Sequence, residues 1–72
     1  MKPFKEHLRE IRKNKGTTQR QVAESIGITE RNYQYYESGG REPAMSTLIA
    51  LADYFDVSID YLVGRSDDPG RR

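Results

Sequence analysis

Apolar residues recur at helical spacing in short stretches of the chain. Phe4, Leu8 and Ile11 lie four and then three residues apart, so a helix would place them on one face. Pro3 suits the first turn of this helix, and Gly16 is a typical residue for its end. The pattern therefore predicts an amphipathic helix between these two residues.

A capping-box signature opens the second helix. Thr18 is followed three residues later by Gln21, so each side chain can satisfy a backbone N–H group beside the other. Val22 and Ile26 then supply an apolar stripe, and Gly27 follows as a helix stop. The sequence predicts a second helix that ends at Ile26.

A tight turn joins this helix to a third one. Gly27 suits a left-handed backbone position, and Ile28 supplies an apolar plug. Thr29 is a natural N-cap for a helix that we expect to continue to about Ser38. Two short helices joined by a turn containing glycine are typical of a helix-turn-helix, although an ordinary corner of a helical bundle has the same pattern.

The fourth helix is predicted over about residues 45–55. Leu48 and Phe55 belong to its apolar stripe. Its first flanking residue, Ala44, has no side-chain oxygen. We therefore expect Ser46 to cap this helix instead.

A short fifth helix and a polar tail complete the chain. Ser58 is the expected N-cap of a helix over residues 59–63, which Gly64 ends. We expect the tail, residues 65–72, to be flexible. The prediction is one domain over residues 1–64 followed by this tail.

Composition narrows the possible functions. The 72 residues include no cysteine and one histidine, His7, which excludes disulfides, thiol catalysis and zinc sites built from cysteine or histidine. No serine stands in a nucleophile-elbow pattern. Asp53, Asp56 and Asp60 lack the glycine and glutamate of a calcium loop. We therefore expect a protein that is not an enzyme and needs no metal, cofactor or small-molecule ligand.

The hydropathy of the chain gives an expected location. Mean hydropathy is −0.89, and no apolar run approaches the length of a membrane span. The first residues show no pattern of a secretion signal. These features predict a soluble, cytoplasmic protein without membrane contact.

Charge is distributed unevenly. Residues 1–41 contain nine Lys or Arg and five Asp or Glu, whereas residues 42–64 contain four acidic residues and no basic one. The formal net charge is only +1, yet the first part is positive and the second negative, so one end of the molecule can face a polyanion. Ordinary solvated helices would also explain these charges.

The third helix divides into two faces. Tyr33 and Tyr36 lie about 60° apart on a helical wheel and define the inner face. Four hydrogen-bonding side chains share the outer face: Arg31, Gln34, Tyr35 and Ser38. Such groups can reach base edges and phosphates in a major groove, although any solvent-exposed helix face would also be polar.

Four segments then stand in a fixed order: GTTQRQVA at 16–23, IGIT at 26–29, YESGGREP at 36–43, and LA at 51–52 with VSIDYLVG at 57–64. In this order and spacing they resemble the Cro/C1-type (XRE-family) helix-turn-helix domain. The resemblance covers about residues 4–64. It implies an all-α, compact five-helix domain of the phage-repressor (lambda repressor-like) type, usually a sequence-specific DNA-binding regulator and often dimeric.

The resemblance also implies roles for single residues. Gln19 would touch a phosphate and brace the third helix. Arg12 would pair with Glu37 and turn toward a phosphate, although an exposed pair of this kind would be worth less than about 1 kcal/mol. The residues expected to contact DNA are Arg12, Lys15, Thr18, Gln19, Thr29, Glu30, Arg31, Asn32, Gln34, Tyr35, Ser38 and Arg41. Of these, Arg31 is the expected guanine reader, and Arg41 lies in the loop that meets the DNA backbone.

Five residues depart from the usual family pattern: Glu30, Tyr33, Tyr35, Gly40 and Ala44. Glu30 is acidic where the protein approaches DNA. It either accepts a hydrogen bond from a cytosine N4 amine or only complements the helix dipole. Tyr33 is large for a position that is usually aliphatic, and we expect its hydroxyl group to reach the surface.

These features lead to one expected function and one rival. The expected function is a regulator, in particular a repressor, that binds double-stranded DNA as a homodimer on a palindromic operator. Ile59, Tyr61 and Val63 would form the dimer interface, or would only cover the first and fourth helices. The rival is an antitoxin-like or protein-interaction module of the same fold, since tyrosines like those of the third helix are enriched at protein interfaces.

Overall fold

Five helices with short connections make up the computed structural model, which describes residues 2–70 and shows no strand among them. Their bounds are α1 Phe4–Asn14, α2 Gln19–Ile26, α3 Glu30–Ser38, α4 Met45–Phe55 and α5 Ile59–Leu62. The all-α, five-helix prediction is therefore confirmed. The helix ends agree with the sequence pattern to within one or two residues.

Side-chain caps fix the start of three helices. Thr18 Oγ1 accepts from the backbone N–H of Gln21 at 3.0 Å, while Gln21 Oε1 accepts from the N–H of Thr18 at 2.8 Å. Thr29 Oγ1 accepts from the N–H of Asn32, and Ser58 Oγ does the same for the first turn of α5. All three predicted caps are confirmed, so local sequence sets where α2, α3 and α5 begin.

The fourth helix corrects an expectation. Its N-cap is Ala44, which makes no side-chain capping bond, and Ser46 lies inside the first turn. The N–H of Leu48 donates to the carbonyl of Ala44 at 3.0 Å, so the backbone ladder already begins ahead of the serine. The prediction that Ser46 caps α4 is wrong because a residue inside the helix cannot adopt the extended backbone of an N-cap.

The turn between α2 and α3 has the predicted geometry. Gly27 has φ +78°, in the left-handed region. The N–H of the next residue, Ile28, donates to the carbonyl of Ala23 at 3.0 Å, which closes the end of α2. Ile28 is half-buried and packs against the core, as expected of an apolar plug.

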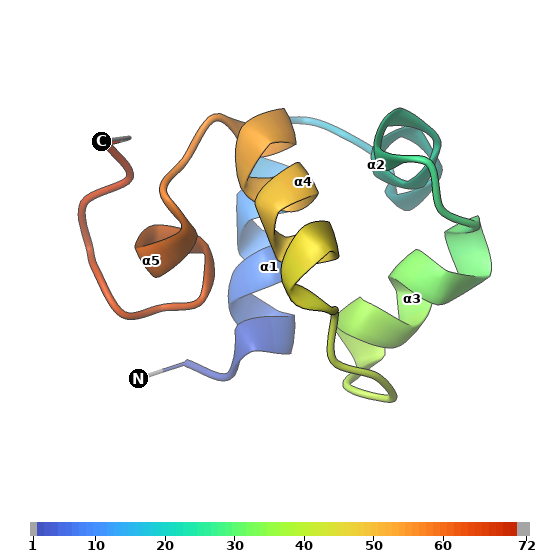
Figure 1. Cartoon of the computed structure of the whole chain (residues 1–72), viewed down its shortest axis with the longest axis horizontal. Coiled ribbons are helices and arrows are strands. Elements are labelled where there is room, and N and C mark those ends of the chain that lie inside the picture. Colours follow the sequence, from blue (N-terminus) through green and yellow to red (C-terminus); the bar gives the residue numbers. More distant parts are fainter. Residues whose placement is uncertain (1, 71–72) are drawn as a thin grey trace.

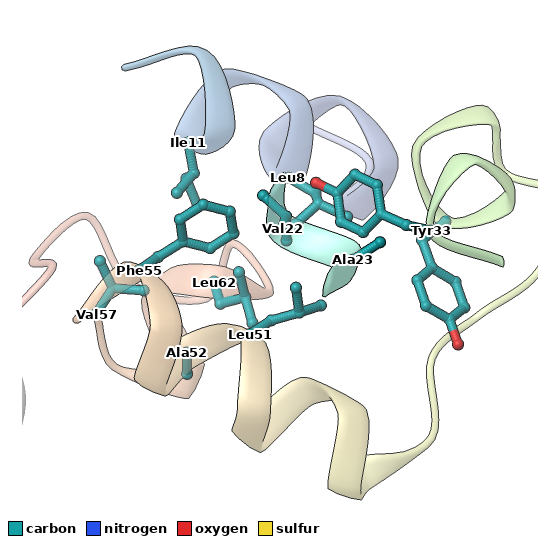
Figure 2. Close-up of a cluster of buried hydrophobic side chains, with 11 residues drawn as sticks. Leu8, Ile11, Val22, Ala23, Tyr33, Leu51, Ala52, Phe55, Val57 and Leu62 are labelled. Atoms are coloured by element: carbon teal, nitrogen blue, oxygen red, sulfur yellow. The ribbon is translucent and has the colours of Figure 1, made fainter. Parts of the chain in front are cut away.

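The helices pack around one core (Figure 2). Its buried side chains come from all five helices and the segment after α4: Leu8, Ile11, Val22, Ala23, Tyr33, Tyr36, Leu51, Ala52, Phe55, Val57 and Leu62. In Figure 1, α2 and α3 lie on one side of α1 and α4, and α5 lies on the other. The helix-turn-helix and the fifth helix therefore occupy opposite ends of the molecule.

Among the described residues, two backbone hydrogen bonds join the polar tail to the domain. The N–H of Arg65 donates to the carbonyl of Asp60 at 2.7 Å. The carbonyl of Pro69 accepts from the N–H of Ser58 at 3.1 Å, just before α5. Residues 71–72 of the predicted tail lie outside the described residues. The flexibility of residues 65–72 stays a prediction.

Candidate nucleic-acid interface

The two faces of α3 differ in burial as the helical wheel predicts. Tyr33 and Tyr36 are 0% and 7% exposed and anchor the helix to the core. The outer side chains of Arg31, Gln34 and Ser38 are exposed, and Tyr35 is 37% exposed. The helix therefore presents an exposed polar surface on the side away from the core.

Tyr33 is buried more deeply than expected. Its hydroxyl oxygen is enclosed and makes no hydrogen bond with the described residues. This burial raises the pKa of the Tyr33 phenol far above its ordinary value, so the group stays neutral. The expectation that this hydroxyl reaches the surface is wrong, because α1 and α2 close over the inner face of α3.

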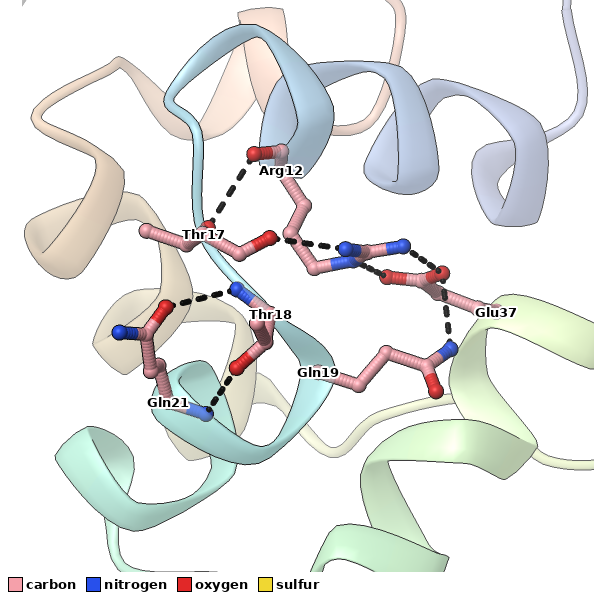
Figure 3. Close-up of polar contacts among 6 residues, drawn as sticks. All are labelled: Arg12, Thr17, Thr18, Gln19, Gln21 and Glu37. Atoms are coloured by element: carbon pink, nitrogen blue, oxygen red, sulfur yellow. Dashed lines mark hydrogen bonds and ion pairs between the residues drawn. The ribbon is translucent and has the colours of Figure 1, made fainter.

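A buried polar network ties α3 to α1 and α2 (Figure 3). Arg12 Nε donates to Glu37 Oε2 at 2.6 Å, and Arg12 Nη2 donates to Glu37 Oε1 at 3.2 Å. Gln19 Nε2 donates to the same Oε1 at 3.1 Å. One carboxylate near the end of α3 thus receives three hydrogen bonds from two other helices.

The pair is more than a surface ion pair. The side chains of Arg12 and Glu37 are only 12% and 4% exposed. Burial acts to raise the pKa of Glu37, but the hydrogen bonds from Arg12 and Gln19 outweigh it, so the pKa lies below its usual range. The hydrogen bonds to Glu37 raise the pKa of Arg12 in turn. Both groups are charged at neutral pH, and the alternative of an exposed pair is wrong.

The guanidinium of Arg12 is occupied within the protein. Besides its two bonds to Glu37, Arg12 Nη1 donates to the carbonyl of Thr17 at 2.8 Å. Thr17 Oγ1 donates back to the carbonyl of Arg12 at 3.1 Å. These contacts hold the turn between α1 and α2, so Arg12 supports the N-terminal end of α2. Gln19 has the same bracing position, as the resemblance implies.

The remaining expected contact residues gather around α2 and α3. Lys15 and Thr18 are exposed at the turn before α2, with the Thr18 oxygen engaged in its capping box. Thr29 caps α3, and Glu30 is exposed in the first turn of that helix. Both interpretations of Glu30 remain compatible with this position.

A contact that the sequence did not predict joins α3 to the loop after it. Arg41 Nη1 donates to Asn32 Oδ1 at 2.8 Å. Cζ of Arg41 also lies 4.8 Å from the centre of the Tyr35 ring, within the range of a cation–π interaction. Three residues expected to contact DNA separately thus form one cluster.

Sequence reasoning also missed Lys5. A Cβ atom placed on Gly39 would stand 2.9 Å from Lys5 Cδ and 3.4 Å from its Nζ, so the lysine crosses directly over the glycine. This places a positive charge at the C-terminal end of α3, beside the loop that contains Arg41. No local pattern marks Lys5, because its neighbour is more than thirty residues away in the sequence.

The expected dimer residues differ in exposure. Ile59 is 37% exposed, whereas Tyr61 and Val63 are half-buried. Tyr61 packs edge-on against His7 of α1, with ring centres 5.0 Å apart. Tyr61 therefore covers α1, as the alternative interpretation states. Two residues of α4 add exposed apolar surface: Met45, 64% exposed, and Ile49, 44% exposed.

Residues 2–70 contain neither a cluster of metal-ligating side chains nor a membrane-spanning helix. Within this range, no three acidic or histidine side chains are grouped so that they could hold a metal ion. None of the helices described is long and apolar enough to cross a bilayer.

Comparison of this chain with models of protein families agrees with the arrangement of α2, the turn and α3. A family model described as Helix-turn-helix matches residues 8–62. The chain belongs to the Cro/C1-type helix-turn-helix family. The match includes both helices of the motif and the Arg12–Glu37 pair that joins them to α1.

Relatives in this helix-turn-helix family are named as transcriptional regulators. The uncharacterized regulator YobD of Bacillus subtilis is 42% identical over 64 residues, covering 89% of this chain and 57% of the relative. The cryptic phage CTXphi transcriptional repressor RstR of Vibrio cholerae is 46% identical over 62 residues, covering 86% and 55%. The chain thus spans little more than half the length of these curated relatives. Their names agree with the expectation of a non-enzymatic domain.

Two solved structures share the fold. A transcriptional regulator from Listeria innocua is 40% identical, with a TM-score of 0.80 over 90% of this chain and 61% of that chain. The P22 c2 repressor, solved with a synthetic operator, has a TM-score of 0.84 over 92% of this chain and all of that one, at 24% identity. The phage-repressor architecture expected from the sequence is therefore confirmed.

Proposed function

We propose that this chain is a sequence-specific DNA-binding transcriptional regulator that places α3 in the major groove. The observation that carries the proposal is the division of α3. Tyr33 and Tyr36 fix it to the core, Glu37 ties it to α1 and α2, and its polar outer face stays exposed. A rigid helix with a free polar face is what groove recognition needs.

Two groups of residues would act differently on DNA. The first-turn N–H groups of α2 would face a DNA phosphate, and Lys15, Thr18 and Ser38 would set the position of the protein on the backbone. Arg31 and Gln34 on the outer face of α3 would read base edges. The positive charge of residues 1–41 would favour the approach to DNA.

Repression on a two-fold operator is the finer form of this proposal. The name of the relative RstR supports repression, and the P22 c2 repressor, which shares the fold, was solved with a synthetic operator. One domain contacts few base pairs, so we infer a homodimer on half-sites about 34 Å apart. Ile59 would contribute to its interface. Sedimentation at micromolar concentration with and without operator DNA tests this, and a monomer in both samples would refute it.

Selection from a random duplex library at about 150 mM salt tests the main proposal. The wild-type chain should enrich one sequence, and Arg31→Ala should lose preference at one base pair at a cost of about 1–3 kcal/mol. Arg65→Ala is the matched control, since Arg65 follows α5 at the opposite end from α3. Its sequence preference should be unchanged. Equal weakening of every sequence by Arg31→Ala would instead make Arg31 a phosphate contact.

A second candidate function rests on the exposed apolar side chains of Met45, Ile49 and Ile59. They favour a protein-interaction or antitoxin-like module whose main partner is another protein. Absence of any enriched DNA sequence, together with tight binding to a co-encoded protein, would decide for this alternative.

A further inference from the structure

One side chain on the outside of α3 belongs to the loop that follows the helix. Arg41 lies beyond the end of α3, yet it donates to Asn32, nine residues earlier and in the first turn. On the way its guanidinium rests over the ring of Tyr35. The loop therefore places the positive charge of Arg41 beside the N-terminal half of α3.

The chemistry of this cluster suits recognition of a base edge by the planar guanidinium of Arg41. The bond to Asn32 uses one of the five N–H donors of an arginine, and Arg41 remains exposed. Stacking on a ring leaves the edge of the guanidinium open, and that edge matches the O6 and N7 acceptors of guanine. Because two contacts already hold the group, little side-chain freedom would be lost when it binds.

The same contacts change what Asn32 and Tyr35 can do. Asparagine reads adenine through its carbonyl and amide groups together, and the carbonyl of Asn32 is already engaged by Arg41. One face of the Tyr35 ring is covered by the guanidinium. Both residues are therefore better placed to hold Arg41 than to read bases by themselves.

We propose that Arg41 reads a guanine in the major groove and that Asn32 and Tyr35 are positioning residues for it. The proposal rests on the proposed function of α3. It departs from the role that the sequence suggests for Arg41, a contact to the DNA backbone, because the first turn of a recognition helix is the part that approaches base edges.

Two substitutions at Arg41 separate base reading from charge. The full chain and each variant would be selected against a random duplex library, and affinity for the wild-type winner would be measured over a range of salt. Arg41→Ala should weaken binding to that duplex about 5- to 150-fold and remove the preference at one base pair. Arg41→Lys keeps the charge but lacks the planar guanidinium that Tyr35 and Asn32 hold in place, so it should weaken the same preference while keeping a similar salt dependence.

The positioning residues give a readout that general destabilisation would not. Asn32→Ala and Tyr35→Leu should lower the preference at the same base pair as Arg41→Ala, with preferences elsewhere retained. Thermal melting of each variant would show that the fold is intact, since none of the three side chains belongs to the buried core.

The outcomes that overturn the inference differ from those that overturn the function. If wild-type protein selects no sequence, both proposals fall. If it selects a sequence that Arg41→Lys selects equally well, and Arg41→Ala weakens all duplexes evenly with a smaller salt dependence, only the inference falls and Arg41 is a phosphate contact. Effects of Asn32→Ala at a different base pair would refute its positioning role.

Discussion

The buried carboxylate of Glu37 offers the sharpest test of what holds α3 in place. Glu37→Gln keeps the size of the side chain and removes its negative charge. The carboxylate receives two hydrogen bonds from Arg12 and one from Gln19. After the substitution, the bond from Arg12 to the carbonyl of Thr17 is the one that does not depend on residue 37. The guanidinium would stay charged in a site where 12% of its side chain meets solvent.

These contacts set the size of the effect. A hydrogen bond to a charged group contributes about 1.5–3 kcal/mol, and the new amide oxygen can still accept one bond. Removing one partner of a buried ion pair costs about 3–5 kcal/mol when no solvent reaches it. We therefore expect Glu37→Gln to lower the free energy of unfolding by about 2–4 kcal/mol. For a domain of this length, each 1 kcal/mol lowers Tm by about 4–8 °C.

An exposed pair provides the matched control. Arg20 donates to Glu24 one turn along α2, with side chains 75% and 67% exposed. Glu24→Gln is the same chemical change and should cost less than about 1 kcal/mol. Urea unfolding of both variants measures the difference. Equal losses would show that the burial of Glu37 adds nothing and would refute the reasoning.

The pH dependence gives a second reading of the same variant. The pKa of Glu37 is lowered in the folded protein, so its contribution is present above its unfolded value of about 4.3 and is lost as pH falls through the folded value. The stability gap between wild type and Glu37→Gln should therefore be full near pH 6 and shrink below about pH 4. A gap that stays constant down to pH 3 would contradict the lowered pKa.

Three further substitutions test the local structure by denaturant unfolding. Gly27→Ala should lose about 1–2 kcal/mol, because φ is +78° and no atom crowds the new Cβ, while Gly27→Asn should lose less; equal losses would point to a packing cause. Tyr33→Phe should be neutral or stabilising by about 1 kcal/mol, since it removes a hydroxyl without a hydrogen-bond partner, and a clear loss would reveal one. Thr29→Ala should lose about 1 kcal/mol as a cap, whereas Ser46→Ala should change stability little; the reverse order would restore Ser46 as a cap.

The fold could be predicted because its signals are local. Thr18 and Gln21 lie within one turn, so their reciprocal bonds depend on no distant contact. The prediction failed at two points: how deeply a side chain is buried, and which residue begins a helix. A helical wheel places Tyr33 on the inner face, but how far its hydroxyl is buried depends on how closely α1 and α2 approach. At α4 the helical hydrogen bonds already begin at the carbonyl of Ala44, so Ser46 lies inside the helix and does not cap it.

The candidate site was predictable only in part. Arg31 and Gln34 share a face by helical periodicity, and the structure keeps them there. The pairing of Arg12 with Glu37 spans 25 residues and came from family resemblance alone. Arg41 over Tyr35 had no signal in the sequence, because the path of the loop after α3 decides where its guanidinium lies.

The two sides of α3 should therefore respond separately to substitution. Glu37 acts from the buried side and fixes the helix to α1 and α2. Arg41 lies on the outer side, where its side chain contacts Asn32 and Tyr35. Glu37→Gln should lower stability and leave the selected DNA sequence unchanged at a temperature where the variant is folded. Arg41→Lys should change the selected sequence and leave stability unchanged. If both variants changed both the stability and the selected DNA sequence, the buried and outer sides of α3 would not act independently. The proposed separation of anchoring by Glu37 from base reading by Arg41 would then be wrong.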